Sequence, residues 1–228
     1  MKKLFILALL ILNGLLTTSA QAATVQVIAS DVLATSGSFT TSPTGTVLTT
    51  AELTDIVTSD VGTFVMSNDS EAYIDLGFGG TQVVTGNGAD LIIYTVGNDY
   101  NFGLQAFDSS SSMISNLLYE VPGDGSSTAQ DENGNDLCLM DAGSCVAAIS
   151  ATSINLFDTG LNEIADNTDI SFIRLFIGTD ADYMPGSAYP LFSMAEATHT
   201  AVVPLPLPVV LFSSGLVLLG WVARQKII

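Results

Sequence analysis

The chain has 228 residues and a formal net charge of −18, and its charges are unevenly distributed. All 23 acidic residues lie between Asp31 and Glu196, whereas Arg174 is the one Lys or Arg between Lys3 and Arg224. A body so poor in cations cannot neutralise phosphates, which excludes nucleic acid as a partner and disfavours docking on anionic lipid. The same balance favours solubility and leaves divalent cations as candidate ligands.

The first residues have the pattern of an export signal. A basic start (Lys2, Lys3) precedes an apolar run over 4–16, and an Ala-Gln-Ala sequence at 20–22 supplies the small residues that a signal peptidase accepts. The apolar run is short for a membrane span. We therefore predict a signal peptide over 1–22 that signal peptidase removes. An uncleaved N-terminal anchor is the alternative.

Residues 23–198 are predicted to form one all-β domain. Short apolar runs rich in β-branched and aromatic residues alternate with Gly, Asn, Asp and Ser, as in strands joined by turns. This texture predicts an antiparallel β-sandwich with a jelly-roll-like body. The predicted strands are 24–30, 63–66, 72–78, 81–84, 90–96, 100–107, 113–119, 146–157, 170–178 and 189–195.

Helical periodicity is scarce, and two long stretches are polar. Residues 49–57 are predicted to form one short helix, capped by Thr49 or Thr50. Residues 35–50 otherwise read as a loop or loose edge, and 122–136 as an exposed loop. The run at 170–178 is apolar on both faces, which predicts a central strand.

Two cysteines, Cys138 and Cys145, lie in the exported body. An oxidising compartment favours a disulfide between them, worth roughly 2–3 kcal/mol on a chain-entropy estimate. Free thiols are the alternative. A zinc site would need further ligands, and the only histidine, His199, is far away in the sequence.

The sequence does not single out a catalytic centre. Asp158-Thr159-Gly160 resembles the catalytic triplet of aspartic proteases, but those enzymes need two such carboxylates and this chain has one copy, so a strand ending in a turn is the preferred interpretation. A serine or cysteine triad would have to use His199, which we predict to lie in a linker. We therefore predict that the protein is not an enzyme; a secreted hydrolase is kept as an alternative.

Calcium is the cofactor that the polar loops favour, because it takes six to eight oxygen ligands. The spacing of Asp131, Asn133 and Asn135 copies the start of an EF-hand loop, but Asp136 replaces its Gly and Ala142 its final Glu. A site gathered from several loops is the remaining form, with solvated acidic loops as the alternative. The candidate ligands are Asp90, Asp99, Asp131, Asn133, Asn135, Asp180 and Asp182.

Arg174 is the sole cation of the body and lies between Phe172 and Phe176 on one strand face. The first interpretation is a half-buried arginine that pairs with an acid and stacks on aromatic rings. The second is an arginine that binds a ligand.

The C-terminal segment has the pattern of a membrane span. Leu205 to Ala223 contains no charged residue, and a helix of that length would span roughly 28 Å. Arg224 and Lys226 follow it and would stay in the cytoplasm by the positive-inside rule. We therefore predict a linker over 199–208 and a transmembrane helix with a short basic tail over 209–228. A plain single-span anchor without processing is one alternative for this segment.

The motif Val203-Pro204-Leu205-Pro206, followed by this apolar run and a basic end, resembles the VPLPA-type branch of the PEP-CTERM sorting tags. The fifth motif residue is Leu207, where the tags have Ala. The resemblance implies recognition by an exosortase, a membrane peptidase of Gram-negative bacteria, and delivery to the cell surface or the exopolysaccharide matrix. It predicts a protein that is tethered to the inner membrane before processing and is structural or adhesive afterwards. A carbohydrate- or calcium-dependent binding module is the alternative, with extracellular polysaccharide as the partner.

Overall fold

The computed structural model describes residues 23–42, 45–59, 63–97, 102–120, 126–130, 134–141, 144–178 and 190–201. The predicted signal peptide, the motif at 203–206 and the predicted transmembrane helix lie outside these ranges. Within them, no helix combines the length and the hydropathy that crossing a bilayer requires.

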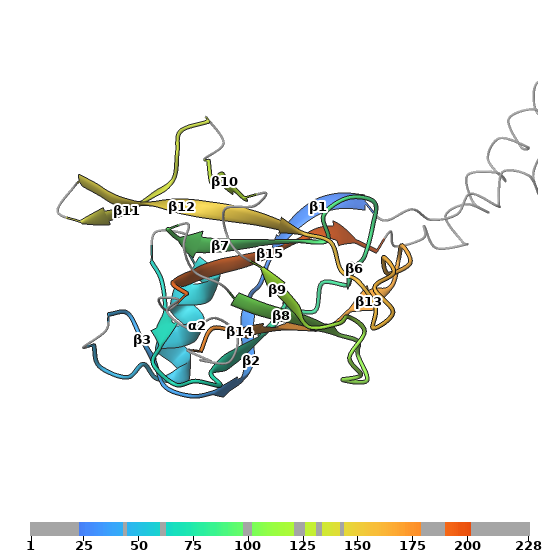
Figure 1. Ribbon diagram of the computed structural model, residues 1–228, viewed down its shortest axis with the longest axis horizontal. Helices are drawn as coiled ribbons and strands as arrows, with labels where there is room; N and C mark the ends of the chain where they lie inside the picture. Colours follow the sequence, from blue (N-terminus) through green and yellow to red (C-terminus); the bar gives the residue numbers. More distant parts are fainter. Residues whose placement is uncertain are drawn as a thin grey trace, which may run out of the picture. The chain divides into compact units, whose positions relative to one another are not determined.

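The described body is all-β, with antiparallel strands arranged in two main sheets (Figure 1). The first sheet contains β1 (Ala23–Ile28), β6 (Val83–Val84), β7 (Leu91–Val96), β10 (Ser126–Thr128), β11 (Cys138–Asp141), β12 (Ser144–Ile154), β13 (Asp169–Ile170) and β15 (Phe192–Thr200). The second sheet contains β2 (Asp31–Ser36), β5 (Tyr73–Gly77), β8 (Phe102–Phe107), β9 (Leu118–Glu120) and β14 (Phe172–Phe176). A short ladder joins β3 (Phe39–Thr40) to β4 (Met66–Ser67).

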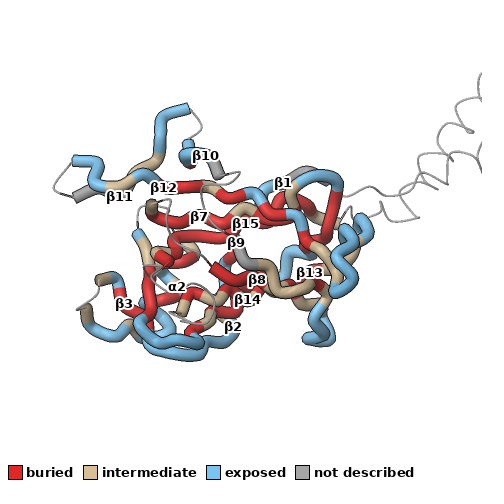
Figure 2. The backbone as a smooth tube through the Cα atoms, in the orientation of Figure 1, coloured by how far each residue is buried: buried red, intermediate tan, exposed pale blue. Residues whose placement is uncertain are grey.

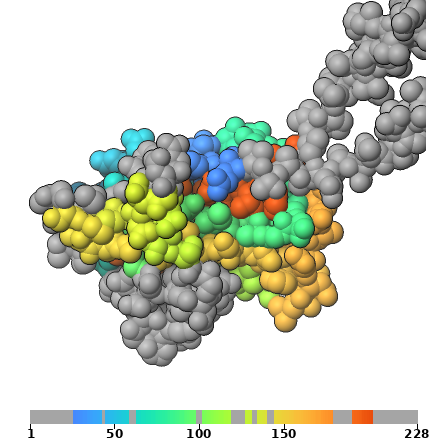
Figure 3. Space-filling model, turned by 90° about the horizontal axis from the view of Figure 1, so that it is seen from above, coloured from blue at the N-terminus to red at the C-terminus, as the bar shows by residue number. Residues whose placement is uncertain are grey.

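The strand order confirms the predicted sandwich. In the first sheet, β1, β15, β7 and β12 are successive antiparallel neighbours, and in the second sheet β5, β14, β8 and β9 are. The chain crosses repeatedly between the sheets, so that the last strand, β15, lies between the first, β1, and β7. This is the strand order of a jelly roll. Figure 3 looks onto the first sheet from above, with β1 in blue and β15 in red side by side.

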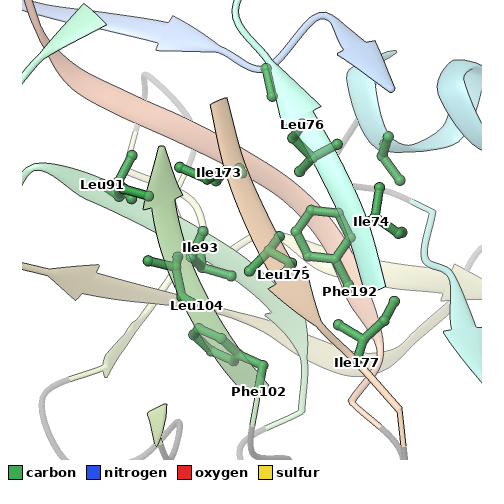
Figure 4. Packing of buried hydrophobic residues seen from close by; sticks show 14 of the residues in the cluster. Ile74, Leu76, Leu91, Ile93, Phe102, Leu104, Ile173, Leu175, Ile177 and Phe192 are labelled. Carbon is green, nitrogen blue, oxygen red and sulfur yellow. The ribbon is translucent and has the colours of Figure 1, made fainter. Parts of the chain in front are cut away.

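The larger of two hydrophobic clusters among the described residues is the core between the two sheets (Figures 2 and 4). It forms because alternate residues of each strand point inward. The labelled side chains in Figure 4 come from both sheets: Ile74, Leu76, Phe102, Leu104, Ile173, Leu175 and Ile177 on one side, and Leu91, Ile93 and Phe192 on the other. Strand β14 lies between β5 and β8, which confirms the central strand predicted at 170–178.

The predicted helix is present as α2 (Thr50–Ser59). Its N-terminus is a capping box: the Thr49 hydroxyl accepts a hydrogen bond from the Glu52 amide (3.3 Å), and the Glu52 carboxylate accepts one from the Thr49 amide (2.8 Å). Leu53 and Val57 pack into the core. The helix therefore covers an end of the sandwich where it contacts β15 and β2.

The structure differs from the predicted elements at polar strands. Strand β2 extends to Ser36, and β10 and β11 fall within or directly after the stretch 122–136 that we expected to be a loop. All three strands pair with a neighbouring strand. The backbone hydrogen bonds of that pairing hold them in a strand, although their polar side chains do not predict one. The linker expected from 199 also begins later, because His199 and Thr200 are the last residues of β15.

Candidate functional site

The predicted disulfide is present and joins Cys138 of β11 to Cys145 of β12, with 5.6 Å between their Cα atoms. The two strands form a hairpin that extends beyond the end of β7 (Figure 1). No free cysteine occurs in the part of the chain that the structure covers. The disulfide therefore crosslinks the most projecting part of the first sheet.

The seven candidate calcium ligands do not form a site in the described part of the body. Asp90 is buried and Asn135 is exposed, whereas Asp99, Asp131, Asn133, Asp180 and Asp182 lie outside the described ranges. Within those ranges no three His, Cys, Asp or Glu side chains are placed to share a metal ion. The calcium site stays a prediction, and its ligands would have to come from loops outside the described ranges.

Asp90 has a structural role. Its Oδ1 accepts a hydrogen bond from the Gly86 amide and its Oδ2 one from the Leu156 amide, each 2.9 Å long. Burial raises the pKa of Asp90 above its ordinary value, and these two hydrogen bonds and the neighbouring His199 oppose that rise. With both oxygens turned toward backbone amides, the carboxylate ties the turn before β7 to the chain that follows β12.

His199 is not in a linker, which corrects our expectation. It is the penultimate residue of β15, it is 5% exposed, and neither ring nitrogen has a hydrogen-bond partner among the described residues. The ring lies against Gly86, where an added Cβ would come within 2.6 Å of the imidazole Cγ. The histidine lies where β15 pairs with β1, with the turn at Gly86 against its ring, which accounts for its burial.

The aspartic-protease-like triplet forms the predicted turn. The Asp158 Oδ1 accepts hydrogen bonds from the Gly160 amide (2.8 Å) and the Asn162 amide (2.9 Å). Hydrogen bonds from Asn162 and Gly160 hold the pKa of Asp158 below its ordinary value, so the carboxylate stays ionised and engaged within its own turn.

The structure confirms the first interpretation of Arg174, a half-buried arginine that pairs with an acid and stacks on aromatic rings. Its Nε donates to Asp75 Oδ1 (2.7 Å) and its Nη2 to Asp75 Oδ2 (2.8 Å), which makes a bidentate ion pair. The guanidinium carbon lies 4.0 Å from the ring centre of Tyr73 and 5.3 Å from that of Phe107. The ion pair and the two rings therefore fix the guanidinium in one plane.

The surroundings of Arg174 are an ordered surface that the sequence did not reveal. Three cross-strand rows lie on the outer face of the second sheet, and we call these residues the aromatic–arginine face. The rows are Gly77–Phe172–Phe107, Asp75–Arg174–Gln105 and Tyr73–Phe176–Gly103 across β5, β14 and β8. The aromatic side chains, Arg174 and Gln105 are each half-buried, whereas the intervening residues of the same strands point into the core.

The signal for this face in the sequence was incomplete. The alternation of Phe172, Arg174 and Phe176 indicated that the three share a face, but their partners on β5 and β8 are about 70 to 100 residues away along the chain. Cross-strand register, which depends on the folded sheet, brings Asp75 and Gln105 onto either side of Arg174.

The two ends of the body meet on the first sheet. β1 begins at Ala23 and β15 ends at Thr200, and these two residues are register partners. The Ala201 amide donates a further hydrogen bond to the Gln82 carbonyl (3.0 Å). The folded body thus extends to within two residues of Val203, where the predicted sorting motif begins.

Another buried carboxylate, besides those of Asp75 and Asp90, lies on β15. Glu196 is 6% exposed, and its Oε2 accepts a hydrogen bond from the Tyr94 hydroxyl (2.9 Å). Burial raises the pKa of Glu196, and the hydrogen bond from Tyr94 opposes that rise. A carboxyl whose pKa is raised on folding stabilises the fold in its protonated form, and this contribution is lost as the pH rises through the folded-state pKa.

We expect Glu196→Gln to raise the thermal midpoint at pH 7.5, because glutamine keeps an acceptor for Tyr94 and removes a buried charge. The expected increase is about 2–4 °C, the shift that about 1 kcal/mol produces in a domain of this size. The difference should shrink as the pH falls toward 4.5, because the raised pKa lets the wild-type carboxyl take up its proton above its ordinary range. Calorimetry across this pH range measures both effects.

Glu71→Gln is the matched control, since Glu71 is exposed and its replacement removes the same charge from the acidic body. An equal gain in both variants would show that general charge repulsion is being relieved. A loss of stability in Glu196→Gln at pH 7.5 would contradict the prediction.

Comparisons with known proteins give no family for the chain. No protein-family model matches it, and no curated protein sequence does. A structure of CpGH89CBM32-4 from Clostridium perfringens, in complex with GlcNAc-α-1,4-galactose, is similar over 78% of this chain and 96% of that one, with 13% identity and a TM-score of 0.34. The CBM32 of AlyQ in complex with 4,5-unsaturated mannuronic acid is similar over 65% and 97%, with 13% identity and a TM-score of 0.24. Both TM-scores are below 0.5, so neither structure supports an inference about the site or ligand of this chain.

Proposed function

We propose that this chain is an exported, non-enzymatic protein of the cell surface or extracellular matrix of a Gram-negative bacterium. Signal peptidase removes residues 1–22, and the C-terminal helix tethers the body to the inner membrane. An exosortase-type peptidase then processes the chain at the motif Val203-Pro204-Leu205-Pro206. The released body is a structural or adhesive component of an exopolysaccharide layer.

The observation that carries this proposal is the position of the two ends of the folded body. Ala23 and Thr200 are paired on neighbouring strands, and both proposed cleavage positions lie directly outside this pair. Processing at either end therefore leaves the strands of both sheets complete. The prolines of the motif favour an extended backbone in the motif itself, which is the conformation that a peptidase binds as a strand.

Two further features support export and the absence of catalysis. The disulfide between Cys138 and Cys145 fits an oxidising compartment. The sole histidine is buried in β15, and the carboxylate of Asp158 is engaged by its own turn. His199 is therefore inaccessible to a substrate at the surface, and the Asp158 carboxylate is already engaged by two backbone amides.

Cell fractionation combined with intact-mass measurement tests the proposal in a Gram-negative host that encodes an exosortase. We expect a mature protein that begins after Ala22 and ends near Pro204, found at the surface or in the medium. In the same host without the exosortase, the mass should extend to Ile228 and the protein should stay in the membrane fraction. A wild-type mass that runs to Ile228 with the peptidase present would overturn the proposal in favour of a plain anchor.

Variants of the motif localise the recognition. Pro204→Ala combined with Pro206→Ala should abolish C-terminal processing and leave the body folded, because both positions follow Thr200, the last residue of β15, in the sequence. Leu207→Ala is the matched control in the same segment, since it restores the fifth residue of the tag, and it should be processed at least as well as the wild type.

A further inference from the structure

We propose that the aromatic–arginine face of the second sheet is a binding surface for a neutral polysaccharide. The proposal concerns the body alone. It rests on the proposed function in one respect, the exopolysaccharide layer as the place where the protein would meet such a ligand. Sorting and binding are therefore separable, and either can fail without the other.

The side chains of this face stand as a ladder. The guanidinium of Arg174 lies between the rings of Tyr73 and Phe107, and the Phe107 ring stacks on that of Phe172 at 4.6 Å with 2° between their planes. These contacts use ring faces, and the rings of Tyr73, Phe107 and Phe172 are each half-exposed. Ring edges carry positive partial charge, so they attract oxygen atoms.

Polar donors continue the same pattern in the middle row. The ion pair with Asp75 uses Nε and Nη2 of Arg174, and no described residue accepts a hydrogen bond from Nη1. Beside it on β8, the Gln105 amide makes a contact of 2.9 Å with the Met113 sulfur and retains its carbonyl as an acceptor. The middle row thus offers planar donors in fixed positions and an acceptor, and rows of aromatic rings flank it. Such a surface suits a ligand that combines hydroxyl groups with apolar C–H surface, as a sugar ring does.

Charge selects the class of polysaccharide. Asp75 neutralises the one cation of the face, and the body around it carries 23 acidic residues. A polyanionic chain would meet repulsion from that body over the screening distance of about 8 Å at physiological ionic strength. A neutral chain meets no such penalty and can still use the donors and aromatic rings.

The arrangement also predicts that binding needs no rearrangement of the fold. The ion pair holds the guanidinium plane, and the inward residues of β5, β14 and β8 belong to the core. The surface is therefore preorganised, which lowers the entropic cost of binding.

Affinity electrophoresis of the full-length chain in mild detergent tests this proposal. The probes are neutral polysaccharides (a β-glucan, a galactomannan and a xylan) and two anionic ones, alginate and heparin. We expect retardation by at least one neutral probe and none by the anionic probes. The body 23–201, which contains the whole described core, is run in parallel and should behave in the same way.

Two variants of the face decide whether it carries the binding. Tyr73→Ala removes one end of the ladder and should weaken binding at least tenfold. Gln105→Ala removes a half-exposed amide outside the core. It should weaken binding several-fold and leave the thermal midpoint unchanged, so it tests the face even if Tyr73→Ala lowers the stability of the fold. Val146→Ala is the control: Val146 is exposed on the β11–β12 hairpin of the other sheet, and binding should not change.

Three results would overturn the proposal: no retardation of the wild type by any neutral probe, retardation by the anionic probes alone, or retention of full binding by both face variants.

Discussion

Asp90→Ala is expected to lower the free energy of unfolding by about 4 kcal/mol. The substitution removes the acceptor of two buried amides, those of Gly86 and Leu156, and a buried N–H left without a partner costs roughly 1–3 kcal/mol. The backbone of Asp90 also pairs with Ile154 and Thr198, so the residue lies where three segments of the first sheet meet. Urea unfolding of the wild type and the variant at pH 7 measures the difference.

Asp90→Asn is the matched variant for this residue. It keeps one acceptor oxygen and removes the buried charge, but it turns an amide donor toward one of the two backbone N–H groups. We therefore expect Asp90→Asn to lower the free energy of unfolding relative to the wild type, but by less than Asp90→Ala does. A loss below about 1 kcal/mol in Asp90→Ala would show that the two amides find other partners and that the carboxylate does not tie these segments together.

Phe192→Ala is expected to cost about 3–5 kcal/mol, the usual range for emptying the space of a buried phenylalanine. Phe192 is 1% exposed, and its ring lies among Ile74, Leu175 and Ile177 of the opposite side of the core (Figure 4). Its backbone exchanges two hydrogen bonds with Val65, of 2.7 Å and 3.0 Å. Calorimetry of the purified variant should show a large fall in the thermal midpoint.

Two companion variants separate packing from other causes. Phe192→Leu fills most of the space and should cost less than about 1.5 kcal/mol. Val47→Ala changes a side chain that is 57% exposed and should shift stability by less than about 0.5 kcal/mol. Equal effects of Phe192→Ala and Val47→Ala would contradict the packing of β15 against the second sheet.

The apolar strands of the body were predictable from the chain alone. Strands such as β5, β7, β8 and β14 are continuous or alternating runs of β-branched and aromatic residues, and such runs are stable only where a sheet buries them. The helix α2 was predictable from its capping residue for a local reason, because Thr49 and Glu52 interact across a single turn.

The polar edge strands were not predictable in the same way. β2, β10 and β11 are short or polar, and a neighbouring strand supplies the hydrogen bonds that hold them. Whether these segments form strands therefore depends on the neighbouring strand as much as on their own residues. For the same reason the end of β15 was placed too early, because His199 and Thr200 carry no pattern that distinguishes a strand from a linker.

By itself, the sequence determined the acidic character of the body, the disulfide partners and the antiparallel strands of its core, because charge, cysteine count and hydrophobic alternation act locally. Only the tertiary structure decided that Asp90 serves two backbone amides, that Ala23 meets Thr200, and that Arg174 lies between Asp75 and Gln105. Each of these depends on register between strands that are distant along the chain. A shift of one residue in that register would turn every one of these side chains to the opposite face.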